Sequence, residues 1–138
     1  MAIFQAFRAL RPVPEKAAAV AALPYDVVDR AEAKAIGDKN PDSFLHVDRA
    51  EMDLPDETDL YEPKVYERAR QNLLNMEKNG VMKQDETPCY YIYELTRKGK
   101  TQTGLVGCCS IDDYMNGVVK KHELTREDKE QDRIRHVD

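Results

Sequence analysis

The residues best suited to chemistry lie near the end of the chain, where cations surround an expected helix start. Lys121 and His122 come just before Thr125, and Asp128 follows three residues later. This spacing is typical of a helix cap, in which a hydroxyl accepts from a free backbone N–H and an acid lies near the positive helix end. Exposed backbone N–H groups beside cations bind anions such as phosphate. The segment therefore predicts a phosphate site.

The expected helix would carry most of its positive charge on one face. At about 3.6 residues per turn, Arg126, Lys129, Arg133 and His136 fall on a single stripe. We predict that Lys121, Arg126, Lys129 and Arg133 contact the phosphate. The alternative is a solvated surface helix, held by side-chain pairs that contribute about 0.2–0.5 kcal/mol each. The sequence leaves both interpretations open.

Three residues are candidates for catalytic acid or base chemistry. His122 and Glu123 adjoin the predicted phosphate site, and either could move a proton. In an extended segment, however, adjacent side chains point to opposite faces, so a plain surface role stays open. Asp26 follows Pro24 on a rigid turn, where an aspartate often bonds its own backbone instead. We predict no metal site, because no Cys or His pair has ligand spacing.

Length and charge exclude several classes of function. At 138 residues the chain is predicted to form a single domain. A net charge of −5 repels nucleic-acid backbones and anionic membranes, so we expect neither as a partner. No apolar run approaches the ~20 residues of a membrane span, and the first residues do not resemble a signal peptide. We therefore expect a cytoplasmic protein.

The three cysteines do not form a disulfide framework. Their number is odd, and Cys108 and Cys109 are adjacent. Neighbouring residues of a strand point to opposite faces, which is a poor arrangement for a bridge between them. Buried or half-buried free thiols in a reducing cytosol are the expected state.

Periodicity, proline and glycine divide the chain into helices and strands. The expected helices cover residues 15–23, 30–38 and 62–78, besides the charged C-terminal one. The expected strands cover residues 3–10, 43–47, 89–96 and 101–111, the last two forming a hairpin. An acidic loop at 48–59 is expected to be mobile. Asp29 is predicted to cap the helix that follows it.

The helix predicted for residues 62–78 has the clearest signal. Val65, Ala69, Leu73 and Met76 lie on one stripe, and Pro63 falls in the first turn. The fold class is therefore α+β. We expect short helices and this long amphipathic helix to pack on a small, mostly antiparallel sheet that contains the hairpin, with a charged helix at the C-terminus.

Four blocks of the sequence together resemble a known family. They are PYDVV (24–28), NPDSFLHV (40–47), QTGLVGCCSIDDY (102–114) and KKHELTREDKEQDRIRH (120–136). In order and spacing they are similar to the uncharacterised prokaryotic proteins of domain-of-unknown-function family ten-fifteen. Members of that family are much longer. The resemblance implies that residues 1–138 are a single domain in the N-terminal portion of a longer protein.

The same resemblance carries two expectations about function. Downstream, family members have an Asp-Gly-His-His-Arg type motif similar to that of free-serine kinases and ParB-like nucleotide-binding domains. This implies a nucleotide-dependent phosphotransferase that uses ADP or ATP with Mg and a small hydroxyl substrate such as serine. The present chain lacks that motif and is expected to be inactive alone. The alternative is a non-catalytic, ParB-like nucleotide-sensing or protein-interaction module, with which a homodimer is compatible.

Overall fold

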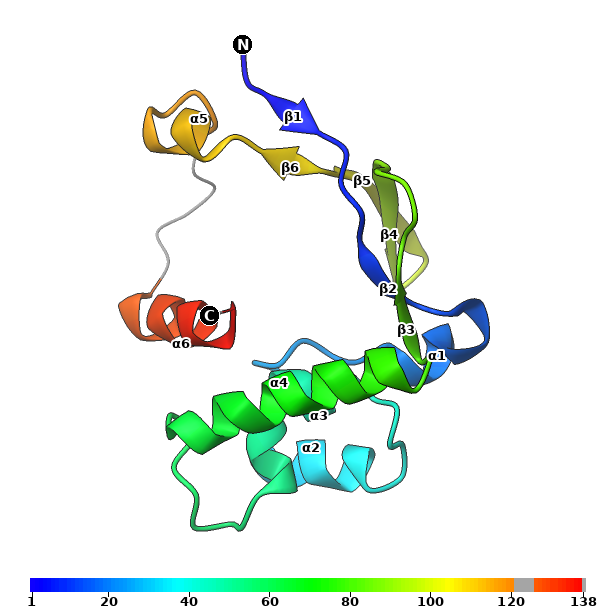
Figure 1. The fold of residues 1–138 in the computed structure, drawn as a ribbon, viewed down its shortest axis with the longest axis vertical. Helices are drawn as coiled ribbons and strands as arrows, with labels where there is room; N and C mark the ends of the chain where they lie inside the picture. Colours follow the sequence, from blue (N-terminus) through cyan, green and yellow to red (C-terminus); the bar gives the residue numbers. More distant parts are fainter. Residues whose placement is uncertain (121–125, 138) are drawn as a thin grey trace. The chain divides into compact units, whose positions relative to one another are not determined.

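The computed structural model describes residues 1–120 and 126–137, and it confirms the α+β class. The chain forms two compact units. The first unit comprises residues Met1–Leu10 and 84–120, and the second comprises Arg11–Lys83 and 126–137. The chain passes from one unit to the other within strands β2 (Leu10–Pro12) and β3 (Met82–Gln84), which pair with each other (Figure 1).

The first unit contains the predicted hairpin. Strand β4 (Tyr91–Arg97) pairs antiparallel with β5 (Lys100–Val106), and the turn between them places Lys98 and Gly99 at φ values of 51° and 75°. Glycine adopts this left-handed conformation without strain, which favours a tight turn here. A short helix, α5 (Ile111–Met115), follows, with the Ser110 side chain accepting from the Asp113 backbone N–H.

The return strand of the hairpin ends earlier than predicted, because a close contact interrupts it at Gly107. Beyond Gly107 the chain forms a separate strand, β6 (Cys108–Cys109), which pairs antiparallel with β1 (Phe4–Gln5). A Cβ on Gly107 would lie 2.5 Å from Cζ of Phe4 and 2.9 Å from the backbone oxygen of Gln5. Only glycine allows β1 to approach this closely.

The expectation of buried or half-buried thiols is wrong. Cys89, Cys108 and Cys109 are free and exposed. The pairing of β1 with β6 leaves both residues of β6 at the surface, because a two-stranded pair covers little of either face.

The second unit is largely helical. Its elements are η1 (Pro14–Lys16), α1 (Ala17–Val20), α2 (Arg30–Gly37), α3 (Leu45–Asp48), η2 (Ala50–Asp53), α4 (Pro63–Lys78) and α6 (Glu127–Val137). Asp29 caps α2 as predicted, with its side chain accepting from the Glu32 backbone N–H while the Glu32 carboxylate accepts from the Asp29 N–H. This reciprocal capping box holds the start of α2.

Among the described residues of this unit, two apolar clusters contribute to the core. One consists of Val28, Ala33, Leu45 and Met52. The other consists of Ala50, Val65 and Ala69, with Leu54 packed against it. Val65, Ala69 and Met76 of the predicted α4 stripe are all buried, so this helix faces the core as expected.

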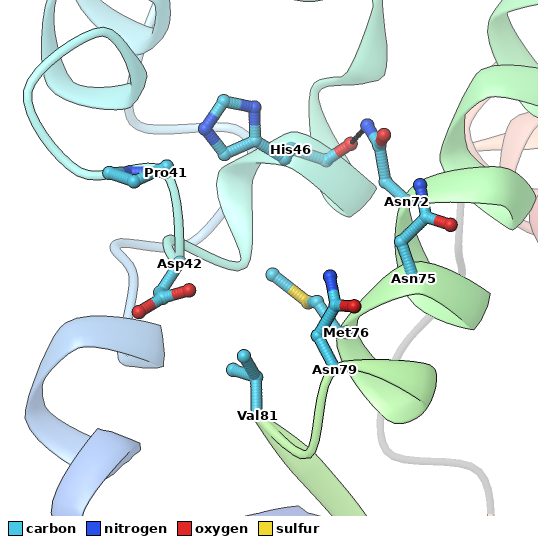
Figure 2. Close-up of a pocket in the computed structure, with 8 residues that line it drawn as sticks. All are labelled: Pro41, Asp42, His46, Asn72, Asn75, Met76, Asn79 and Val81. Carbon is cyan, nitrogen blue, oxygen red and sulfur yellow. Dashed lines mark hydrogen bonds between the residues drawn. The ribbon is translucent and has the colours of Figure 1, made fainter.

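The strand predicted for residues 43–47 is wrong, because these residues turn into helix α3. The Ser43 N–H donates to the Asn40 oxygen, and the His46 N–H donates to the Ser43 oxygen. The helical turn pairs these backbone groups within the segment and buries both Leu45 and Val47, although residues two apart share a face in a strand and not in a helix. On α4, the Asn72 amide donates to the backbone oxygen of His46 at 2.6 Å and joins the two helices (Figure 2).

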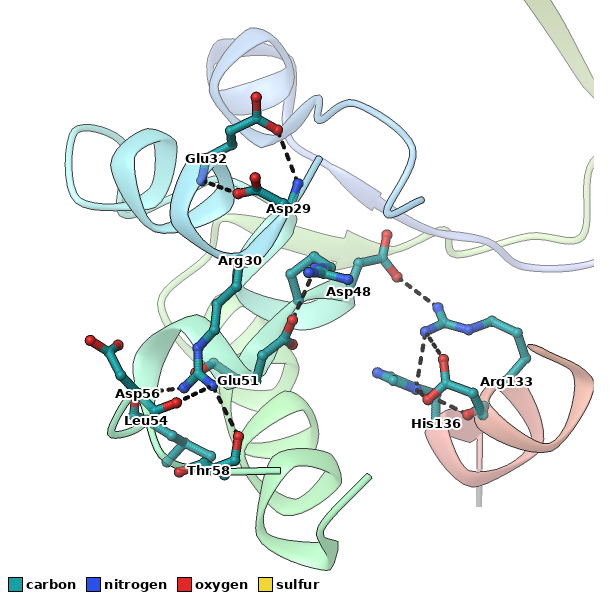
Figure 3. Close-up of polar contacts among 12 residues, drawn as sticks. Asp29, Arg30, Glu32, Asp48, Glu51, Leu54, Asp56, Thr58, Arg133 and His136 are labelled. Atoms are coloured by element: carbon teal, nitrogen blue, oxygen red, sulfur yellow. Dashed lines mark hydrogen bonds and ion pairs between the residues drawn. The ribbon is translucent and has the colours of Figure 1, made fainter. Parts of the chain in front are cut away.

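The acidic segment predicted as a loop is partly helical and is held by one arginine. Among its residues η2 forms a 3-10 turn, in which Glu51 is only 4% exposed. From the first turn of α2, the Arg30 guanidinium donates to five backbone oxygens, those of Glu51, Leu54, Pro55, Asp56 and Thr58. Figure 3 shows this guanidinium enclosed by the segment. All five bonds come from Nη1 and Nη2, whose N–H groups point outward from one planar guanidinium.

Within residues 1–120 and 126–137, no helix combines the length and the apolar character that a membrane crossing requires.

Candidate functional site

A small hollow in the second unit is lined by residues from four parts of the sequence. Its cavity volume is about 50 Å³. The lining residues are Tyr25, Asp48, Arg49, Glu51, Leu60, Tyr61, Val65, Lys129, Asp132, Arg133 and His136. The polar ones come from the turn after Pro24, from α3, η2 and Arg49 between them, from Tyr61 before α4, and from one face of α6.

Two cations of α6 lie over the ring of Tyr25. The guanidinium carbon of Arg133 is 4.0 Å from the ring centroid, and Nζ of Lys129 is 5.4 Å from it. The negative face of an aromatic ring attracts cations at these distances, by about 0.5–1 kcal/mol at exposed sites. Tyr25 therefore helps to hold Lys129 and Arg133 at the hollow.

Arg133 also contacts two carboxylates. Its Nη1 lies 3.4 Å from Oδ1 of Asp48, and its Nη2 donates to Oδ2 of Asp132 at 2.8 Å (Figure 3). The Asp48 contact is long for a charge-assisted hydrogen bond, whereas the Asp132 contact is of normal length. Arg133 is thus firmly held by its own helix and only weakly held by α3.

Asp132 is the most strongly held carboxylate of the hollow. Its side chain is 12% exposed and accepts from the Tyr66 hydroxyl at 3.0 Å, as well as from Arg133. Burial acts to raise the pKa of Asp132, but the hydrogen bonds from Arg133 and Tyr66 and the nearby positive charges outweigh it, so the pKa lies below its ordinary value. Burial, followed by the hydrogen bond to Asp132, raises the pKa of Tyr66. Asp132 is therefore ionised at neutral pH.

His136 packs edge-on against Tyr66, with ring centroids 4.9 Å apart at 86°. Its Nδ1 lies 3.1 Å from the backbone oxygen of Asp132 and 3.2 Å from Nη2 of Arg133. A protonated Nδ1 donates to the oxygen, whereas a bare Nδ1 accepts from Arg133, so the two bonds belong to different tautomers. Nε2 is buried and has no hydrogen-bond partner among the described residues.

Arg49 and Glu51 form a further charged pair in the wall of the hollow. Nε of Arg49 lies 2.9 Å from Oε1 of Glu51, and the side chains are only 16% and 6% exposed. The two atoms meet as an ion pair without the alignment of a hydrogen bond. Two buried charges remain compatible with the fold because each compensates the other.

The structure brings together two of the four predicted phosphate-binding residues. Lys129 and Arg133 line the hollow, together with His136 of the same predicted stripe. Arg126 is exposed and does not line it. Lys121, together with the catalytic candidates His122 and Glu123, lies outside the described residues, as does the predicted Thr125 cap.

Asp26, the remaining catalytic candidate, is exposed and is not part of the lining. Its neighbour Tyr25 provides the aromatic ring of the hollow instead.

A family model described as "Protein of unknown function (DUF1015)" matches residues 4–138, nearly the whole chain. The chain belongs to the DUF1015 family. No curated protein and no solved structure matches this DUF1015 chain.

Sequence reasoning missed several lining residues of this DUF1015 chain. Asp48, Arg49 and Glu51 fell in the segment predicted to be a mobile loop. One signal was present, because the apolar Ala50 and Met52 alternate with these charges, which is unusual for a solvated loop. Both apolar residues are buried, and they fix the neighbouring charged side chains at the hollow.

The described part of the chain contains no group of three or more His, Cys, Asp or Glu side chains that could hold a metal ion. In the hollow, Asp132 and His136 contact Arg133 and Tyr66, Asp48 contacts Arg133, and Glu51 pairs with Arg49.

Proposed function

We propose that the hollow binds a phosphate group of a nucleotide. The observation that supports this proposal is the position of Lys129 and Arg133, one turn apart on α6, both over Tyr25 and both facing the same hollow as Arg49. Three cations around one small cavity provide the charge and the hydrogen-bond donors that a phosphate requires.

The charge balance of the hollow leaves room for one anion. Three carboxylates line it, but Asp132 and Glu51 are each in close contact with an arginine. Lys129 forms no ion pair with a described residue, and the Asp48 contact of Arg133 is the long one at 3.4 Å. A phosphate would bind Lys129 and replace Asp48 as a partner of Arg133.

The size of the cavity limits what enters it. A volume of about 50 Å³ accommodates a phosphoryl group but not a nucleobase. The base and sugar would therefore extend outside the hollow. ADP, ATP and CTP all end in a phosphate group. We expect them to bind with similar affinity, because this contact involves the phosphate alone.

For the whole protein, the proposed reaction is phosphoryl transfer from ADP or ATP, with Mg, to a small hydroxyl substrate such as serine. Such chemistry depends mainly on positioning and charge neutralisation, which Lys129 and Arg133 would supply. Asp26, His122 and Glu123 remain the proposed acid or base candidates. Lys121 and Arg126 remain proposed phosphate contacts, although Arg126 does not line the hollow.

One observation favours a second candidate, a nucleotide-sensing module that binds without turnover and associates as a homodimer. The hydrogen bonds to Asp132 hold its pKa below the ordinary value, so this carboxylate of the hollow is a weak base. Asp132 is therefore suited to holding Arg133 and not to accepting a proton, which is all that a site that only binds requires of it.

Calorimetry on the 138-residue chain tests the binding step. ADP, ATP and CTP should each bind, and Lys129→Ala should weaken binding about tenfold because one charge-assisted contact is lost. Lys39→Ala removes an equal charge from an exposed position outside the hollow and should change nothing. Equal nucleotide affinities of the wild type, Lys129→Ala and Lys39→Ala would refute the site. A product assay with ADP or ATP and serine on a longer family member then separates transfer from sensing.

A further inference from the structure

A groove between α4 and α6 in the helical unit has a cavity volume of about 440 Å³, and its lining has one residue in common with the hollow, His136. Its apolar lining residues are Val47 of α3, Ala69, Leu73 and Leu74 of α4, and Val137 of α6. Val47 and Ala69 are buried, whereas Leu74 is 46% exposed and Val137 is 86% exposed. Part of this apolar lining is therefore open to solvent.

The face of α4 that borders the groove is not the face that packs into the core. Glu67, Arg70 and Leu74 are three and four residues apart, so they lie on one side of the helix, next to the buried stripe of Val65 and Ala69. All three are exposed. An exposed leucine adds little to the core, and exposed apolar side chains that line a groove together mark a binding surface.

The charged side chains of the groove leave one positive charge uncompensated. Arg70 comes from α4 and Arg135 from α6, and Glu67 is the single acid of the lining. Neither Arg70 nor Glu67 forms an ion pair or a hydrogen bond with a described residue. The guanidinium of Arg135 interacts with the Tyr66 hydroxyl. Two guanidinium groups and one carboxylate favour a ligand with a single negative charge, since a guanidinium binds a carboxylate through paired N–H groups.

Two other polar groups at the groove are already bonded. The Tyr66 hydroxyl donates to Asp132 at 3.0 Å, and Nδ1 of His136 lies 3.1 Å from the Asp132 backbone oxygen. Recognition of a polar ligand group therefore falls to the two arginines. Their apolar stems extend the lining of the groove beneath the charged heads.

A second copy of the chain fits this groove poorly. Two copies related by a twofold axis present the same surface to each other, so the uncompensated positive charge of the two grooves would come together. Like charges repel, whereas a small anion with an apolar chain matches both the charge and the lining. The groove therefore favours a small ligand over self-association.

We propose that the groove binds a linear monocarboxylate of about six to ten carbons. Its carboxylate pairs with Arg70 and Arg135, and its chain lies along Leu73, Leu74 and Val137. An apolar cavity of about 150 Å³ holds a six-carbon ring, so about 440 Å³ has room for such a chain. This site does not depend on the phosphate site.

Calorimetry on the 138-residue chain with butanoate, hexanoate and octanoate tests the proposal. The affinity should rise about two- to fourfold with each added CH₂ group, because each one buries more apolar surface. Octanol has the same chain length without the charge and should bind at least about tenfold more weakly than octanoate.

Two variants at exposed positions separate the charge from the apolar contact. Arg70→Gln should weaken octanoate binding about tenfold and leave octanol binding unchanged. Arg68→Gln, at an exposed position of the same helix outside the groove, is its control. Leu74→Ser should weaken both ligands about fivefold. Ile134→Ser, at a position of α6 that is 45% exposed and outside the groove, should weaken neither.

Four results would overturn the carboxylate site. Octanoate gives no saturable heat, or the three carboxylates bind equally well, or Arg70→Gln binds octanoate like the wild type. The fourth is a sedimentation mass that falls from dimer to monomer when octanoate is added, which would show that a second copy covers the groove. Lys129→Ala, the variant of the phosphate test, should bind octanoate normally, so the two proposals can fail separately.

Discussion

The guanidinium of Arg133 lies over the ring of Tyr25, with its central carbon 4.0 Å from the ring centroid. This contact joins a turn near the start of the second unit to the last helix of the chain. It also leaves the guanidinium nitrogens at the rim of a hollow that Lys129 lines as well. The orientation of Arg133 therefore depends on an aromatic side chain that forms no hydrogen bond to it.

Replacing this aromatic ring should weaken nucleotide binding. Tyr25→Leu removes the cation–π contact, worth about 0.5–1 kcal/mol, and should lower the affinity for ADP about two- to fivefold in calorimetry. Tyr25→Phe keeps the ring and should bind like the wild type. If the Phe variant binds as weakly as the Leu variant, then the hydroxyl and not the ring face is responsible.

Asp132 should make the stability of the fold depend on acid pH. Its pKa is lowered in the folded state from the ordinary value of 3.8, so its contribution is complete above that pH and is lost as the pH falls through the lower folded-state pKa. Asp132→Asn should therefore reduce the free energy of unfolding at pH 7, and the deficit should shrink below about pH 3.8. Urea unfolding at both pH values measures it. A deficit that is constant with pH would assign the effect to packing.

Removal of the Arg30 clamp should destabilise the segment that contains η2. Arg30→Ala leaves five backbone oxygens without their donor, and we expect a loss of about 2–4 kcal/mol in the free energy of unfolding. Arg30→Lys should recover only part of it, since an ammonium lacks the planar fork. Arg68→Ala, at an exposed position on α4, is the matched control and should cost less than about 0.5 kcal/mol. Equal losses in the two alanine variants would contradict the clamp.

Gly37→Ala should be destabilising even though alanine is the better helix former. In a free helix this change stabilises by about 1 kcal/mol. Here the new Cβ would lie 2.5 Å from Cε of Met52 and 3.1 Å from Cε1 of His46. We expect a net loss of about 1–3 kcal/mol in urea unfolding. In a double-mutant cycle, Met52→Ala should relieve part of that loss, and additive effects would argue against the contact.

The candidate site was only partly predictable, for a physical reason. The helical spacing of Lys129, Arg133 and His136 places them on one face, and this follows from local geometry. The local sequence does not determine which part of the protein that face of α6 packs against. Tyr25, Asp48 and Glu51 reach the hollow only after Ala50, Met52 and Val65 are buried, and burial of these residues depends on contacts between distant segments.

Taken alone, the sequence determined those elements whose signals are local. Pro63 and the apolar stripe are sufficient for α4, Asp29 and Glu32 for the start of α2, and alternating β-formers for the hairpin. Only the tertiary structure decided that residues 45–48 form a helix instead of a strand, and that Arg30 holds the acidic segment. A short apolar run satisfies either periodicity, so the choice falls to whichever conformation buries Leu45 and Val47 against α2 and α4 while pairing their backbone groups.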